Sequence, residues 1–349
     1  MKRIIELDIY KAAAAVMVIL IHVTATPVVT LGAGISAEVL VAVNRFAKPS
    51  VPMFIFASGV SLCYVYRNGE FRYMEFLKKR IMKILLPYLF WCAIYYGYYV
   101  MNGAYEASPM DFLAGAVSGK MIYHLYFVVI IIQFYLLFGF FRSVSERLRP
   151  LNALPAAIII NMLAIQYLPA EYMGRCFLTY LTYYLMGCYL GKYLEEAVLF
   201  IKKYQLLFGA AFIGTGALYA FQFYEAQVLG IGYRFLPDAY AFLIFSAIAC
   251  IFYYICAGAV CRATGGGRPQ EKPSALGRLL IAISDGSYYI YLSHPLAIIA
   301  AESLSARLGV TGVIDRMLVA LAVIFATAVP LSILYARTMA AWRRRRAKS

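Results

Sequence analysis

The chain has 349 residues, of which 63% are hydrophobic and only 14% are charged. Soluble globular proteins carry about 25% charged residues, so this composition excludes an ordinary soluble enzyme and predicts a polytopic membrane protein. The formal net charge is +15. Because the cations gather between apolar segments, we assign them to membrane topology and expect no nucleic-acid partner. The seven cysteines include no CxxC pair and predict neither a disulfide nor a metal site.

Ten apolar segments are long enough to cross a bilayer as helices. Their approximate ranges are 9–30, 45–66, 84–101, 121–141, 151–168, 176–194, 204–224, 237–261, 279–300 and 315–337. The sequence therefore predicts an all-α fold with about ten transmembrane helices. We expect residues 1–341 to form a single membrane domain and residues 342–349 to form a basic cytoplasmic tail.

The positions of Lys and Arg predict the orientation. If both termini are cytoplasmic, 24 of the 32 Lys and Arg residues lie on the cytoplasmic side and 7 lie outside, with Lys11 set apart. Cytoplasmic loops carry such an excess of cations, and an even number of spans leaves both termini on that side. The distribution therefore predicts a multi-pass protein with both termini in the cytoplasm. We also expect its membrane to be the plasma membrane of a bacterium.

The first apolar segment carries a polar stripe. Asp8, Lys11 and His22 recur at spacings that place them within about 40° of one helix face. Ionisable side chains inside a bilayer are costly and usually face a protein interior or a watery cavity. A neutral His22 can act as a base. The alternatives are a histidine that packs between helices and a lysine that reaches the lipid surface; the shared face favours function.

The second and third segments carry two further candidates. Pro49 and Pro52 precede the small pair Ser58-Gly59, which predicts a kinked helix that packs closely or lets a ligand approach its backbone. At the inner mouth of the third segment stands a basic cluster, formed by Lys78, Lys79, Arg80 and Lys83. Membrane topology explains this cluster by itself, and a clamp for the phosphates of a cytosolic ligand is the functional alternative.

Polar residues also enter the fourth and ninth segments. His124 and Tyr126 stand at the start of the fourth, near the predicted outer face, where they can contact an acceptor or simply lie at the interface. The ninth contains Ser284, Asp285 and His294 and is too polar to face lipid, so we expect it to line the interior. We name Ser58, Tyr126, His124 and His294 as candidate substrate-binding residues.

Four motifs together resemble the acyltransferase-3 family of integral membrane acyltransferases. They are Asp8-x2-Lys11-x10-His22, the stretch VPMFIFASG, Arg80-x2-Lys83 before LLPY, and SYYIYLSHP in the ninth segment. The resemblance covers nearly the whole chain. It implies an O-acyltransferase that moves an acyl group, usually acetyl from acetyl-CoA, to a hydroxyl of a cell-surface or lipid-linked glycan.

The resemblance also implies roles for individual residues. His22 would be the catalytic histidine, and Asp8 and Lys11 would shape and charge a channel for the donor. Arg80 and Lys83, with Lys79 beside them, would hold the phosphates of CoA. The family usually has Arg where this chain has Lys11 and Lys83, and Lys keeps the charge but lacks the two-pronged guanidinium.

Two other classes of protein remain open at this stage. A transporter or flippase for a lipid-linked sugar or small solute also has intramembrane charges and broken helices. An export or assembly partner of a polysaccharide synthase would need His22 only for structure. The sequence leaves open the acceptor, the length of the acyl chain and whether copies of the chain assemble into a homo-oligomer.

Overall fold

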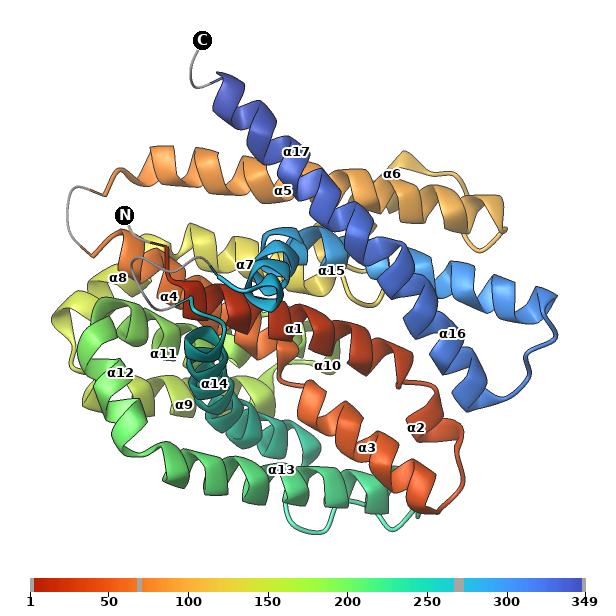
Figure 1. The fold of residues 1–349 in the computed structure, drawn as a ribbon, viewed down its shortest axis with the longest axis horizontal. Helices are drawn as coiled ribbons and strands as arrows, with labels where there is room; N and C mark the ends of the chain where they lie inside the picture. Colours follow the sequence, from red (N-terminus) through yellow and green to blue (C-terminus); the bar gives the residue numbers. More distant parts are fainter. Residues whose placement is uncertain (1–2, 68–70, 267–272, 347–349) are drawn as a thin grey trace. The chain divides into compact units, whose positions relative to one another are not determined.

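The computed structural model describes residues 3–67, 71–266 and 273–346, and within these ranges it contains helices and no strands (Figure 1). The prediction of an all-α fold is confirmed for this part of the chain. The helices are α1 (Ile5–Val23), α2 (Pro27–Thr30), α3 (Ile35–Ala47), α4 (Ser50–Val65), α5 (Tyr73–Met101), α6 (Pro109–Ser118), α7 (Tyr126–Leu136), α8 (Phe138–Arg147), α9 (Pro150–Tyr167), α10 (Ala170–Met173), η1 (Phe177–Tyr180), α11 (Leu181–Lys192), α12 (Leu194–Lys203), α13 (Gln205–Gln227), α14 (Asp238–Ala263), α15 (Ala275–Arg307), α16 (Val313–Ala326) and α17 (Ala328–Arg346).

Among the described residues, seven helical stretches are long and apolar enough to cross a membrane, or eight if α7 and α8, bent by 58°, form one span. The chain is thus a multi-pass membrane protein. Two predicted segments lie outside this set. Segment 176–194 is divided between η1 and the 12-residue α11, and segment 279–300 lies in α15, where its polar residues lower the hydropathy. The count of ten and the cytoplasmic termini stay predictions.

The chain folds into two compact units. The first consists of Met1–Phe54 and Leu199–Ser349, and the second consists of Ile55–Val198. The chain passes from one unit to the other within α4 and again within α12. The prediction that residues 1–341 form one domain stays a prediction, and each unit is described below by itself.

In the first unit, α1 lies against α15, which also packs against α16 and α17 (Figure 1). Their common core contains small and branched side chains: Ala12, Ala15 and Ile19 of α1, Ile283, Ile290, Ala297 and Ala301 of α15, Ala320 and Ile324 of α16, and Val329 of α17. Alanine at a helix contact lets two backbones approach closely, which is the usual way that helices associate within a membrane. The polar side chains of α1 are therefore held against α15 by a tightly packed seam.

The helix is interrupted at Pro49, where the sequence predicts a kink. Helix α3 ends at Ala47 and α4 begins at Ser50, so Lys48 and Pro49 form the break. Proline has no amide hydrogen and cannot continue the hydrogen bonding of a preceding helix. Pro52 lies in the first turn of α4, where the missing hydrogen costs little because the first amide groups of a helix have no partner in it.

In the second unit, the side-chain amides of partly buried Gln133 and buried Asn161 hold the segment that leads into α11. Gln133 of α7 donates to the carbonyl of Arg175 at 2.8 Å and accepts from the amide of Phe177 at 3.0 Å. Asn161 of α9 donates to the carbonyl of Thr179 at 2.9 Å. These bonds satisfy backbone groups where the chain is not α-helical, which is necessary away from water.

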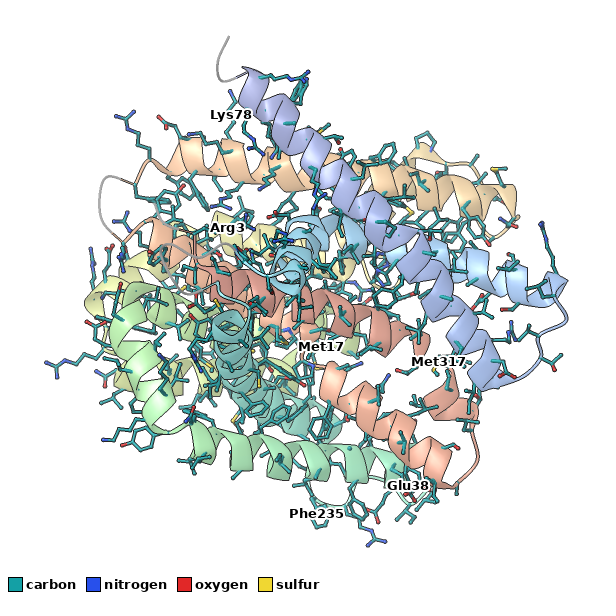
Figure 2. All side chains as sticks on the ribbon, viewed as in Figure 1. Arg3, Met17, Glu38, Lys78, Phe235 and Met317 are labelled. Atoms are coloured by element: carbon teal, nitrogen blue, oxygen red, sulfur yellow. The ribbon has the colours of Figure 1, made fainter. Side chains whose placement is uncertain are left out.

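Large apolar side chains are exposed on many helices, for example Met101, Leu151 and Leu206, each more than 80% exposed. Phe235, in the loop between α13 and α14, is 63% exposed and projects outward (Figure 2). Water would not favour so much exposed apolar area. The surrounding medium is therefore the hydrocarbon of a bilayer.

Candidate active site

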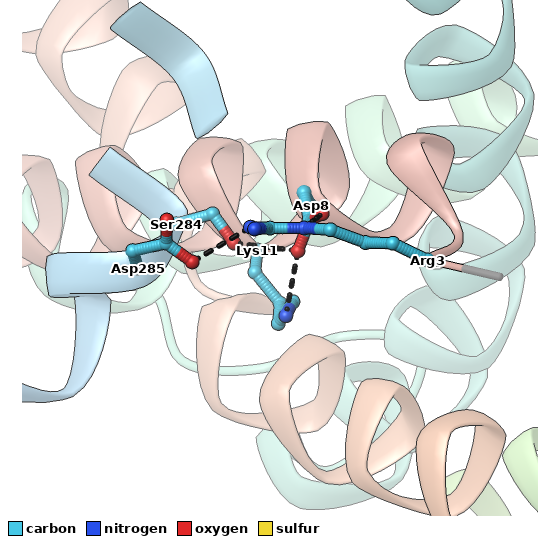
Figure 3. A network of polar contacts seen from close by, with 5 residues as sticks. All are labelled: Arg3, Asp8, Lys11, Ser284 and Asp285. Atoms are coloured by element: carbon cyan, nitrogen blue, oxygen red, sulfur yellow. Dashed lines mark hydrogen bonds and ion pairs between the residues drawn. The ribbon is translucent and has the colours of Figure 1, made fainter. Parts of the chain in front are cut away.

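A polar network joins the start of α1 to α15 within the first unit (Figure 3). The side chain of Asp8 is only 5% exposed, and its carboxylate lies 3.0 Å from Nζ of Lys11. Ser284 of α15 donates its hydroxyl to the same carboxylate at 3.1 Å. Arg3, just before α1, forms an ion pair with the other carboxylate oxygen. Three partners thus stabilise one buried negative charge.

Arg3 connects this buried carboxylate to a second one. Its Nη2 lies 2.6 Å from Oδ1 of Asp285, and both of these side chains are about half exposed. Partial burial opposes the charge of Arg3, but hydrogen bonds and the charges of Asp8 and Asp285 outweigh it and raise the pKa of the guanidinium. Two cations and two carboxylates therefore form a cluster with no net charge.

A pair of histidines joins the same two helices further along. The rings of His22 on α1 and His294 on α15 are stacked, with centroids 5.1 Å apart and an interplanar angle of 27°. His294 is fully buried, whereas His22 is partly exposed. Nδ1 of His294 lies 3.1 Å from the carbonyl of Ile290. A carbonyl only accepts hydrogen bonds, so Nδ1 carries the hydrogen and Nε2 of neutral His294 is an acceptor.

The order of these contacts gives the direction of the helices. Asp8 meets Ser284, and His22 meets His294, so α1 and α15 run in the same direction. Both ends of the polar stripe predicted on α1 therefore face α15. Between these two polar contacts, the seam contains buried apolar side chains, among them Ala15, Ile19 and Ile290.

A buried cation lies beside the C-terminal end of α1. Arg45 of α3 is 6% exposed, donates to the side chain of Asn44 at 2.6 Å and lies 3.6 Å above the ring of Phe223. Asn44 in turn donates to the hydroxyl of Thr24 at 2.8 Å. This arrangement ties α1, α3 and α13 together.

Lys48 also lies near this end of α1. It follows α3 directly, and its ammonium group is within electrostatic range of the His22 imidazole. A positive charge in this position attracts a group that becomes negative beside His22.

The predicted CoA-binding residues lie in the second unit, at the start of α5. Lys79 and Lys83 are exposed and one turn apart, and Arg80 is partly buried. Lys78, also exposed, adjoins them (Figure 2). The residues at positions 79, 80 and 83 share one side of the helix, because positions three and four apart are neighbours on a helix surface.

The remaining predicted residues of the second unit are largely buried. The hydroxyl of Ser58, on α4, is buried and has no hydrogen-bond partner among the described residues. His124 is 1% exposed and lies edge-on to the ring of Tyr95, with centroids 5.7 Å apart. Tyr126 begins α7, and its hydroxyl pairs with that of Tyr180. His124 thus lies inside the unit rather than at its surface.

Three residues of the polar network around Asp8 are not among the candidate site residues predicted from the sequence. Arg3 precedes the first apolar segment and resembles an ordinary topology-setting cation, so nothing in its position distinguishes it. The sequence predicts that Ser284 and Asp285 face the interior, because adjacent polar side chains within a spanning segment avoid lipid. Among the described residues, no group of three or more His, Cys, Asp or Glu side chains is arranged to hold a metal ion.

The comparisons with known proteins give the family. Residues 4–337 match the acyltransferase domain family, Acyl_transf_3. A protein of Bacillus subtilis (strain 168), described as "Putative membrane-bound acyltransferase YfiQ", is 24% identical over 311 residues, which cover 83% of this chain and 79% of that protein. No solved structure matches the chain significantly. Because the family match spans nearly the whole chain, the protein belongs to the acyltransferase-3 family and is a membrane acyltransferase for groups other than amino-acyl groups.

Proposed function

We propose that the protein transfers an acyl group, acetyl in the first instance, from acyl-CoA to a hydroxyl of a cell-surface or lipid-linked glycan. The observation that carries this proposal is the stacked pair of His22 and His294, which lies on the same helix seam as the charged cluster around Asp8. A base within a membrane interior, on a helix that carries a charged cluster near its start, suits a reaction between a water-soluble donor and a surface acceptor.

In the proposed reaction, His22 takes the proton of the acceptor hydroxyl. The hydroxyl oxygen attacks the thioester carbonyl carbon, forming a C–O bond and a tetrahedral oxyanion. Collapse of this intermediate breaks the C–S bond, and protonated His22 returns its proton to the CoA thiolate. The products are the acylated glycan and free CoA. Lys48, which is within electrostatic range of His22, stabilises the negative charge that forms there.

His294 acts in this proposal as a positioning residue. Its own orientation is set by the bond from Nδ1 to the carbonyl of Ile290, and its ring stacks on that of His22. A ring held in this way limits the rotation of His22, and a correctly oriented base transfers a proton faster than a freely rotating one.

The donor is proposed to bind at the start of α5. Arg80, Lys83 and Lys79 offer three cations on one side of the helix, and the nucleotide end of CoA carries several phosphate charges. Asp8 and Lys11 are proposed to line the path of the pantetheine arm. For the acceptor we propose Ser58, Tyr126 and His124 as contacts, supported by the buried hydroxyl of Ser58, which has no hydrogen-bond partner among the described residues.

The reaction is proposed to take place in a bacterial plasma membrane, with ten spans and both termini in the cytoplasm. The unequal distribution of Lys and Arg supports this orientation,. The similarity to a protein of Bacillus subtilis supports a bacterial setting.

The test uses membranes that contain the full chain, supplied with acetyl-CoA labelled in its acetyl group. We expect label to enter the cell-envelope glycan fraction as a base-labile ester. His22→Ala should lower this transfer by about 100-fold or more, the usual contribution of a general base. The purified His22→Ala variant should still bind CoA with the affinity of the wild type, because the donor phosphates are held elsewhere.

A pair of matched variants tests the donor site in the same preparation. Arg80→Ala/Lys83→Ala should lose CoA binding, whereas Arg147→Ala/Arg149→Ala removes two exposed cations of α8 and the residues after it and should keep it. Full transfer by His22→Ala would refute the role of His22. Movement of a labelled sugar across the membrane without any ester product would instead identify a transporter.

A further inference from the structure

A groove lies between α15 and α17 in the first unit and has a volume of about 420 Å³. Its lining residues are Arg278, Leu279 and Ala282 of α15 and Pro330, Ile333, Leu334 and Arg337 of α17. Pockets for small molecules have volumes of roughly 300–1,000 Å³, so this groove is large enough to hold part of a ligand. None of the residues proposed for catalysis lines it.

The lining is amphipathic. Arg278 and Arg337 are its charged residues, and the side chains between them are apolar. Arg278 donates to the carbonyl of Pro273 at 2.9 Å. Among the described acidic residues, none forms an ion pair with either arginine. Two exposed guanidinium groups beside an apolar groove attract an anion that also carries a hydrocarbon chain.

The charged and apolar lining residues follow the same order along both helices. Arg278 lies near the start of α15, with Leu279 and Ala282 further into the helix. Arg337 lies towards the end of α17, and Leu334, Ile333 and Pro330 lead back from it, over about 10 Å,. On both helices, the cation stands nearer the polar terminus and the apolar residues lie deeper. A phospholipid has this same arrangement of charge and hydrocarbon.

Next to the groove, α15 and α17 are in direct contact. Ser293 and Ser332 lie 3.3 Å apart through their hydroxyls, and the rings of Tyr289 and Tyr335 meet at 4.6 Å. A Cβ at Gly286 would lie 3.2 Å from the backbone nitrogen of Ile333. Ala282 is the smallest lining residue, and the close contact of Gly286 with Ile333 lies one turn further along α15.

We propose that this groove binds one anionic phospholipid of the surrounding bilayer. Arg278 and Arg337 hold its phosphate, and an acyl chain lies along Ala282, Ile333 and Leu334. A free nucleotide or CoA fits less well, because the apolar lining offers no hydrogen-bond partners for a base or ribose. The bound lipid braces α15, the helix that carries Ser284 and His294, against α17.

The test titrates the purified full chain in detergent with dioleoylphosphatidylglycerol and counts bound molecules by native mass spectrometry. We expect one retained molecule. Arg278→Gln/Arg337→Gln should weaken its retention by about tenfold or more, since two cations near an anionic headgroup are lost. Ala282→Leu, which keeps both charges and fills the groove, should also prevent retention. The control Arg344→Gln/Arg345→Gln removes two exposed cations of α17 outside the groove and should change retention by less than about twofold.

Three results would overturn the proposal. Equal retention of dioleoylphosphatidylcholine would show that the headgroup charge is not recognised. An equal loss in the control variant would show that general positive charge attracts the lipid. Displacement of the lipid by inorganic phosphate at similar concentration would identify a free-phosphate site without a role for the chain. None of these readouts depends on acyl transfer.

Discussion

Asp8 is the residue on which the charged cluster depends. Its carboxylate is buried, and it is held by Arg3, Lys11 and Ser284. A buried carboxylate without partners would cost several kcal/mol or take up a proton. With Arg3 and Asp285 included, the charges cancel, so the cluster can lie next to the apolar seam.

Replacing Asp8 therefore tests the cluster at the scale of one residue. Asp8→Asn should lower the free energy of unfolding by about 1.5–3 kcal/mol, the value of hydrogen bonds to a charged group. The loss is limited because Arg3 and Lys11 can still reach water. The measurement is the thermal unfolding midpoint of the purified protein in detergent.

Asp285→Asn is the matched control. Asp285 also pairs with Arg3, but its side chain is 49% exposed, and exposed ion pairs contribute only about 0–1 kcal/mol. An equal fall in stability for the two variants would show that the burial of Asp8 does not determine its contribution to the free energy of unfolding.

At the scale of elements, three glycines set the contact between α4 and α11. A Cβ at Gly59 would collide with the carbonyl of Tyr184, and one at Gly187 would collide with the carbonyl of Phe56. Gly191 meets the carbonyl of Val60 in the same way. Of the two interpretations of the Ser58-Gly59 pair, close packing is therefore the one that applies to Gly59.

Gly187→Ala tests this contact. Because the obstructing atoms belong to the backbone of α4, the helices must move apart, and we expect a loss of about 1–3 kcal/mol, typical of overpacking. Gly214→Ala is the matched control. Gly214 is an exposed position of α13 with nothing within 4 Å of the added atom, so alanine there should be neutral or slightly stabilising. A neutral Gly187→Ala, measured by the same unfolding midpoint, would contradict the tight crossing.

At the scale of the whole molecule, the number of spans depends on α11 and α15. Together, η1 and α11 extend over roughly 26 Å,, which is close to the thickness of the hydrocarbon core of about 30 Å. Most residues of α11 are buried, so it does not need a lipid-compatible surface. A test based on helix length and hydropathy does not detect a crossing by such a helix.

Cysteine labelling decides this point. Glu171 and Glu196 are exposed and stand on either side of this segment. Each is replaced by Cys in a protein that already carries Cys176→Ser. Labelling of the Cys176→Ser protein alone gives the background signal. If the segment crosses, a membrane-impermeant maleimide should label Glu171→Cys in intact cells and Glu196→Cys only after the membrane is opened. Labelling of both from the same side would contradict the ten-span topology.

Local properties of the sequence are enough to predict the class of the fold and the helix that carries Asp8, Lys11 and His22. A composition so low in charge leaves a bilayer as the only suitable solvent, and there helices satisfy every backbone group within one segment. The spacing of Asp8, Lys11 and His22 placed them on one face, because the period of a helix is a local property. All of these inferences need only neighbours in the chain.

The partners of that face were decided by tertiary structure. Ser284 and His294 lie more than 270 positions from Asp8 and His22, and no local period indicates which distant helix will pack against α1. That choice depends on which alanine and glycine surfaces fit together, as along the α1–α15 seam and at Gly187. Arg3 likewise became part of the cluster only because folding brought Asp8 and Asp285 within its reach.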